Sequence, residues 1–216
     1  MQLQELINTL SIWSIFLPII TGIYKLLKLK YIPGIIFSIC LIGTPPQLLN
    51  YIHRSSPLKP LFYNLYLILE FVLVYFLFRR ELKKRRLFTT MVCLFYPLIA
   101  FYFLQNQLTT EFTPYMVCVN SAVYIVWVFI FIMEQVDSED SASTFSISNS
   151  FFWYLTGIFL YATCTYPIFM LWDYIYTNKN DPLVKSLLMV HDVINTLMYV
   201  LFTIGLIKDY QVKEAS

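Results

Sequence analysis

The sequence predicts an all-α integral membrane protein, a bundle of seven transmembrane helices that forms a single domain over residues 1–216. Three observations predict this class: the apolar composition, seven long apolar segments, and the short charged connections between them. Hydrophobic residues make up 58% of the chain and charged residues 13%, against about 45–50% and about 25% in soluble domains. Lipid is therefore the expected solvent.

The seven apolar segments each approach the roughly 20 residues that cross a bilayer as a helix. Lipid offers the backbone no hydrogen-bond partner, and the segments lack the polar alternation of barrel strands, so each is expected to be helical. No connection is long enough for a separate catalytic or DNA-binding domain. The predicted spans are 7–27, 31–51, 61–78, 87–104, 114–133, 151–172 and 183–207.

Lysine and arginine set the expected orientation, because they are retained on the cytoplasmic side. The odd number of spans then places the N-terminus outside and the C-terminus in the cytoplasm. The first span has no basic leader or small-residue cleavage site, so we expect it to be kept in the membrane. The fifth connection is acidic, which opposes this orientation only weakly. The basic residues lie in the first connection (Lys25, Lys28 and Lys30) and in the third (Arg79, Arg80, Lys83, Lys84, Arg85 and Arg86).

Signatures of metal, cofactor and nucleotide chemistry are missing from the sequence. It has no glycine-rich phosphate loop, nucleophile elbow, metalloprotease motif or paired-cysteine zinc spacing, and it has only two histidines. We therefore expect no metal, no cofactor and no nucleic-acid partner, and no recognisable catalytic motif points to an enzyme. The cysteines all fall inside predicted spans and are expected to be free thiols: Cys40, Cys93, Cys118 and Cys164.

Three aromatic-rich stretches give the chain a resemblance to a known group of proteins. They are Phe62-Tyr-Asn-Leu-Tyr-Leu-Ile-Leu-Glu70, Phe152-Trp-Tyr-Leu-Thr-Gly157 leading to Pro167, and Asn195-Thr-Leu-Met-Tyr199 with Gly205. Together they resemble a family of small seven-span proteins common in Bacteroidota. The resemblance implies the seven-helix fold and a bacterial inner-membrane location, and it implies no particular reaction.

Glu70 is the most informative ionisable residue, because it lies in the middle of the third span. An ionised group at the bilayer centre costs roughly 2.5–3.5 kcal/mol, so a partner or a cavity is expected. Tyr66 and Tyr63, four and seven residues earlier, share its helical face and can hydrogen-bond the carboxyl group. Two interpretations stay open: a structural glutamate that joins helices, or a group that moves protons or binds a ligand.

The seventh span carries a polar stripe. His191 and Asn195 are four residues apart, and Asp192, Asn195 and Tyr199 follow the spacing of one helical face. His191 and Asp192 point about 100° apart and need not touch. The stripe predicts either a hydrogen-bonded packing face or a functional surface in which His191 exchanges a proton.

The second span contains Gly-Thr-Pro-Pro at 43–46, which is expected to kink or break the helix. Gln47, Asn50 and His53 follow the prolines at about one-turn spacing. Broken membrane helices often expose backbone and polar groups to a ligand. The sequence therefore places a third set of polar groups beside the bundle interior.

These features predict an outward-facing cavity that suits a small amphiphilic ligand within the surrounding membrane lipids. A sensor or receptor-like protein of this kind needs a separate signalling protein, because no signalling domain is attached. The alternatives are a proton-coupled transporter, an intramembrane lipid-modifying enzyme, and a purely structural protein. The predicted ligand-binding residues are Glu70, Tyr63, Tyr66, His191, Asp192, Asn195, Gln47 and Asn50.

Overall fold

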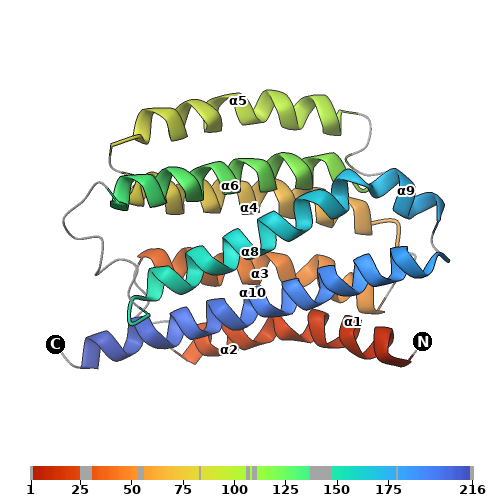
Figure 1. Ribbon diagram of the computed structural model, residues 1–216, viewed down its shortest axis with the longest axis horizontal. Coiled ribbons are helices and arrows are strands. Elements are labelled where there is room, and N and C mark those ends of the chain that lie inside the picture. The colour runs from red at the N-terminus through yellow and green to blue at the C-terminus, as the bar shows by residue number, and fades with distance from the viewer. Residues whose placement is uncertain are drawn as a thin grey trace.

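The computed structural model describes residues 2–24, 31–52, 56–82, 84–105, 108, 111–136, 147–178 and 180–214. Across these ranges the chain is helical and contains no strand. The helices run along one common direction, with the two ends of the chain at opposite ends of the bundle (Figure 1). They are α1 (Gln2–Ser14), α2 (Phe16–Tyr24), α3 (Tyr31–Ile52), α4 (Lys59–Glu81), α5 (Arg86–Leu104), α6 (Pro114–Val136), α8 (Ser150–Met170), α9 (Trp172–Thr177) and α10 (Pro182–Glu214).

Six stretches among the described residues are long and apolar enough to cross a membrane. They are Leu3–Tyr24, which combines α1 and α2, and then Tyr31–Leu49, Lys59–Glu81, Arg86–Leu104, Pro114–Val136 and Pro182–Asp209. The prediction of an all-α integral membrane protein is confirmed.

The predicted span 151–172 corresponds mainly to α8, which is not among these six stretches. Its tyrosine, threonine and tryptophan side chains lower its hydropathy, although it holds no charged residue. The chain turns at Leu171 and continues as the short helix α9. The predicted span therefore ran past the end of α8 and did not anticipate the turn. α8 packs along α6 on one side and α10 on the other.

The first span is divided into α1 and α2 at Ile15. Pro18 explains the interruption, because proline has no N–H for the carbonyl of Ser14 and its ring clashes with that turn. The Ser14 hydroxyl compensates locally by donating to the Ser11 carbonyl at 2.7 Å. The cavity-facing half of the span, α1, is thereby separated from α2.

α3 continues through Pro45 and Pro46, so the predicted break is absent. The prolines still remove two backbone donors, and the Thr44 hydroxyl donates to the Cys40 carbonyl at 3.0 Å one turn earlier. The fully buried Ile36 and Cys40 hold the helix in the core, where α3 packs along α4. Tertiary packing therefore outweighs the local cost of the proline pair.

Two glycines allow α8 and α10 to approach closely. A Cβ atom on Gly205 of α10 would lie within 3.0 Å of three ring atoms of Tyr154, and a Cβ on Gly157 of α8 would lie 2.9 Å from the Phe202 ring. Both rings are buried, with exposed fractions of 0% for Tyr154 and 1% for Phe202. Small residues at helix contacts are the usual means of close packing in lipid.

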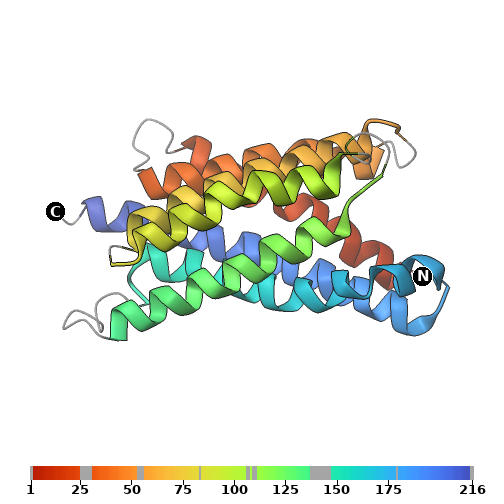
Figure 2. The same ribbon diagram turned by 90° about the horizontal axis from the view of Figure 1, so that it is seen from above.

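At the edge of the bundle, in contrast to the close α8–α10 contact, helix α5 leaves apolar side chains exposed. α5 packs only along α4 and α6 among its major contacts; it lies at one side of the molecule in Figure 1 and nearest the viewer in Figure 2, which looks onto that side. Its Leu94, Leu98 and Phe101 are 66–69% exposed. In a protein that spans a membrane, these apolar side chains face lipid.

We predict that Gly205→Ala lowers the melting temperature of the purified protein. Overpacking of this kind costs about 1–3 kcal/mol. Gly34→Ala is the matched control, because no atom lies within 4 Å of a Cβ at Gly34. Alanine favours the helix over glycine, so the control should keep or raise the melting temperature. Equal effects of the two substitutions would contradict the close α8–α10 contact.

Candidate functional site

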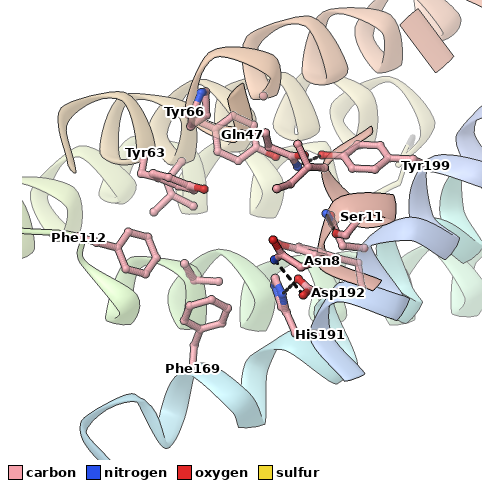
Figure 3. Close-up of a pocket in the computed structure, with 17 residues that line it drawn as sticks. Asn8, Ser11, Gln47, Tyr63, Tyr66, Phe112, Phe169, His191, Asp192 and Tyr199 are labelled. Atoms are coloured by element: carbon pink, nitrogen blue, oxygen red, sulfur yellow. Dashed lines mark hydrogen bonds and ion pairs between the residues drawn. The ribbon is translucent and has the colours of Figure 1, made fainter. Parts of the chain in front are cut away.

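A cavity of about 130 Å³ lies inside the bundle, between residues from α1, α3, α4, α6, α8 and α10. An engineered cavity of similar size, about 150 Å³, holds benzene, so this space fits a group of a few heavy atoms. Tyr63 and Phe112 lie on the opposite side of it from Asp192 (Figure 3). Its polar lining residues are Asn8, Ser11, Gln47, Tyr63, Tyr66, Tyr161, His191, Asp192, Asn195 and Tyr199.

Two side chains of α1 pair with two side chains of α10 at this cavity. The Asn8 amide donates to the Asp192 carboxylate with an Nδ2–Oδ2 distance of 3.1 Å. The Asn195 amide donates to the Ser11 hydroxyl with an Nδ2–Oγ distance of 2.9 Å, and this pair is buried. Asn8 and Ser11 are three residues apart on α1, as are Asp192 and Asn195 on α10, so the two polar stripes meet face to face.

His191 and Asp192 contact each other, although adjacent helix positions point about 100° apart. His191 Nδ1 lies 3.6 Å from Asp192 Oδ1, an ion-pair distance when the histidine is protonated. The carboxylate thus has the Asn8 amide at one oxygen and the imidazole at the other. His191 Nε2 is buried and has no hydrogen-bond partner in the described part of the chain.

Gln47 joins α3 to the same site. Its Nε2 atom donates to the Tyr199 hydroxyl at 2.9 Å, which links α3 to α10. Its Oε1 atom is buried without a partner among the residues that the structure describes. The side chain of Asn50 and all of His53, which the sequence places in the same polar set, lie outside the described residues.

The predicted α4 residues divide between the cavity and the core behind it. Tyr63 and Tyr66 line the cavity, whereas Glu70 is not among the lining residues. Glu70 is only 7% exposed, and its carboxyl group has a side-chain hydrogen bond with Tyr66. It also interacts electrostatically with Tyr124 of α6 and Tyr161 of α8. Glu70 therefore connects to the cavity through Tyr66.

A larger vestibule of about 840 Å³ continues from the cavity at the end of the bundle where α1, α4 and α10 begin. Phe112 packs against the rings of Phe169 and Trp172, with centroid distances of 5.8 and 5.5 Å. Glu5 and Lys59 are its charged residues besides Asp192. The residues that line both spaces are Asn8, Tyr63, Phe112, Phe169, His191 and Asp192.

The opposite end of the bundle is basic. Arg79, Arg80 and Arg86 line an open pocket of about 330 Å³ with Tyr31 and Phe76, and the Arg80 guanidinium lies 5.0 Å from the Tyr31 ring centroid. These arginines come from the predicted cytoplasmic connection. α4 extends from the vestibule to this pocket, and its length separates the two by about 30 Å.

Sequence reasoning missed several contributors to the cavity. Asn8, Ser11 and Ser14 recur every third position of an apolar segment, and that spacing was the available signal for a polar face. Phe112 precedes α6 and carried no such signal, since only the chain path brings it to Tyr63, with a centroid distance of 5.6 Å. Tyr161 and Phe169 belong to α8, whose aromatic residues are too numerous to single out.

The described residues also bear on metal and cysteine chemistry. No group of three or more His, Cys, Asp or Glu side chains within them is arranged to hold a metal ion. The four cysteines are free thiols, as the sequence predicts. Their distribution over α3, α5, α6 and α8 leaves the cavity without a cysteine among its lining residues.

Comparison with known proteins identifies no relative: no protein-family profile, no curated protein and no solved structure matches the chain.

We predict a measurable coupling between Ser11 and Asn195 in a double-mutant cycle with Ser11→Ala and Asn195→Leu. Side-chain hydrogen bonds between membrane helices contribute about 0.6 kcal/mol on average and up to about 1.7 kcal/mol. Unfolding of the purified protein in mixed micelles measures the four free energies. Thr21→Ala is the control, because the Thr21 hydroxyl donates only to the Leu17 carbonyl of its own helix. Additive effects of the Ser11 and Asn195 changes would contradict the buried contact.

Proposed function

We propose that the protein is a receptor-like membrane module that binds a small amphiphilic ligand in the cavity between α1, α3, α4, α6, α8 and α10. The observation that carries this proposal is a polar cavity inside an apolar bundle that opens into an aromatic vestibule. A packing-only role accounts for the Ser11–Asn195 contact. It does not account for Gln47 and His191, which line the cavity and each carry a buried polar atom without a partner among the described residues.

The mixed polarity of the two spaces favours an amphiphile. The side chains of Gln47 and Asn195 line only the inner cavity and Trp172 lines only the vestibule, whereas His191, Asp192, Phe112 and Phe169 line both. A ligand with a small polar head and an apolar tail can contact the polar groups and the rings at once. The same mixture fits the amphiphiles that a membrane interface concentrates.

We further propose seven spans, with α8 as the seventh crossing, the N-terminus outside and the C-terminus in the cytoplasm. α8 has 21 residues without a charge and packs along its neighbours α6 and α10, which it crosses at a slant (Figure 1). The arginine-lined pocket lies at the C-terminal end of the bundle, which favours a cytoplasmic position for that end. The vestibule then opens to the outside. A bacterial inner-membrane location, as in the Bacteroidota family that the chain resembles, is part of this proposal.

Signalling requires that the ligand favour one of two helix arrangements. α1 is the element best suited to move, because it carries Asn8 and Ser11 and is interrupted at Ile15. Its main partner α10 extends for 33 residues from the cavity end to the opposite end. A separate signalling protein that reads this shift would contact the basic α4–α5 connection.

The Tyr66–Glu70 contact favours a second candidate, a proton-coupled transporter. Glu70 is a buried ionisable group one hydrogen bond away from the cavity, a position typical of a proton-relay residue. Ion or substrate flux in proteoliposomes that is lost in Glu70→Gln would support transport. Flux that is absent from the native protein would favour the receptor-like function.

We predict that a cysteine at Thr9 reacts with a membrane-impermeant thiol reagent applied to intact cells, in a chain whose four cysteines are replaced by alanine. Thr9 lines the vestibule. A cysteine at Arg86, in the arginine pocket, is the matched control and should react only after the membrane is permeabilised. The reverse pattern would show the opposite orientation and contradict an outward-facing vestibule.

We also predict that Val117→Phe abolishes ligand binding by filling the cavity. Val117 lines the cavity and is 5% exposed, whereas Val126 on the same helix is 45% exposed and lies outside it. Pentylamine, pentanol and butyrate are the probes, and stabilisation of the purified protein against heat reports their binding. At least one probe should stabilise the native protein and the Val126→Phe control. Retained stabilisation in Val117→Phe, or none in the native protein, would contradict the ligand site.

A further inference from the structure

Two residues that line the cavity carry buried hydrogen-bond acceptors without a donor among the described residues. Gln47 uses its Nε2 atom for the Tyr199 hydroxyl, which leaves Oε1 as a buried acceptor without a partner among the described residues. His191 Nδ1 faces the Asp192 carboxylate, so we assign the imidazole proton to Nδ1 from this geometry. His191 Nε2, the other buried atom without a described partner, is then also an acceptor.

The charge of the inner cavity also favours a hydrogen-bond donor, and one that carries a positive charge. Asp192 is its ionisable carboxylate, and no lysine or arginine occurs among the described residues that line it. The Asn8 amide satisfies one carboxylate oxygen as a neutral donor and leaves the negative charge in place. Lys59, the basic residue of the vestibule, lies farther out, with Nζ 6.0 Å from the Tyr63 ring centroid.

Aromatic rings surround the space opposite this carboxylate. Tyr63 and Phe112 lie along one side of the cavity and Asn8 and Asp192 lie along the other (Figure 3), while the Phe169 ring contacts the His191 imidazole at a centroid distance of 5.5 Å. The Phe112 ring contacts the Tyr63 and Phe169 rings through edge-to-face packing, at centroid distances of 5.6 and 5.8 Å. Aromatic faces beside a carboxylate are the usual surroundings of an ammonium group in a protein.

We propose that the ligand of this cavity is a small organic amine bound as its ammonium ion. Its N–H groups donate to His191 Nε2 and Gln47 Oε1, Asp192 balances its charge, and its alkyl chain leaves the cavity between the aromatic rings into the vestibule. This inference rests on the proposed function and narrows it to one class of ligand. The cavity volume restricts the enclosed part to a few heavy atoms.

The experiment compares probes of similar size on the full-length protein in detergent. Pentylamine is cationic at neutral pH, pentanol is neutral and butyrate is anionic, while tetramethylammonium has the charge without an N–H donor. Dissociation constants come from the concentration dependence of thermal stabilisation. We expect pentylamine to bind at least about tenfold more tightly than pentanol or butyrate, because hydrogen bonds from a charged donor are stronger than those from a neutral one. Tetramethylammonium should bind more weakly than pentylamine.

Two variants, each without one carboxylate, test which carboxylate is responsible for tight pentylamine binding. Asp192→Asn removes the charge in the inner cavity and should weaken pentylamine binding at least about tenfold while leaving pentanol binding unchanged. Glu5→Gln is the matched control, because Glu5 lines the vestibule and not the inner cavity, and its effect should be much smaller. Should Asp192→Asn fail to fold, the order of the four probes on the native protein still decides the proposal.

The outcomes separate this inference from the function on which it rests. Pentanol or butyrate binding that equals or exceeds pentylamine binding, and that is lost in Val117→Phe, would overturn the amine ligand and keep the ligand-binding cavity. Pentylamine binding that is equal in Asp192→Asn and the native protein would also overturn it. Absence of binding by all four probes would overturn both proposals.

Discussion

Hydrocarbon gives an amide or a carboxylate no hydrogen-bond partner, and this constraint organises the interior of the bundle. Asn8, Ser11, Asp192 and Asn195 cannot face lipid without cost, and pairing α1 against α10 gives each of them a partner. Gln47 extends the polar contacts to α3 through Tyr199. The same requirement is not met everywhere at the cavity, because Gln47 and His191 line it and each keep a buried polar atom without a partner among the described residues.

Elsewhere in the bundle, the helices are held by close packing instead of paired polar side chains. α8 lies between α6 and α10, and the glycines at 157 and 205 bring the α8 and α10 backbones together. Lipid tails are as apolar as leucine, so close van der Waals contact is what holds such helices. The α8–α10 contact is closely packed, whereas the first span is interrupted. This combination suits a rigid frame beside an element that can shift.

The sequence predicted the helices well because membrane spans follow from length and apolar composition alone. It also identified His191, Asp192, Asn195, Gln47, Tyr63 and Tyr66, all of which line the cavity, because polar groups in apolar segments are rare enough to stand out. Asn8 and Ser11 were missed although their spacing was visible, and Phe112 was beyond prediction because tertiary proximity has no local signal. Glu70 shows what helical spacing alone does not predict. It shares a helix face with Tyr66, yet it does not line the cavity.

The pairing of α1 with α10 is tested most directly by disulfide cross-linking in membranes. In a chain without its four native cysteines, Ser11→Cys combined with Asn195→Cys should form a disulfide under mild oxidation, because these side chains are in contact in the structure. Leu10→Cys with Asn195→Cys is the comparison, since Leu10 is 54% exposed on another face of α1. Rapid cross-linking of the 11–195 pair alone is the predicted result. Equal or faster cross-linking of the 10–195 pair would contradict the buried polar interface.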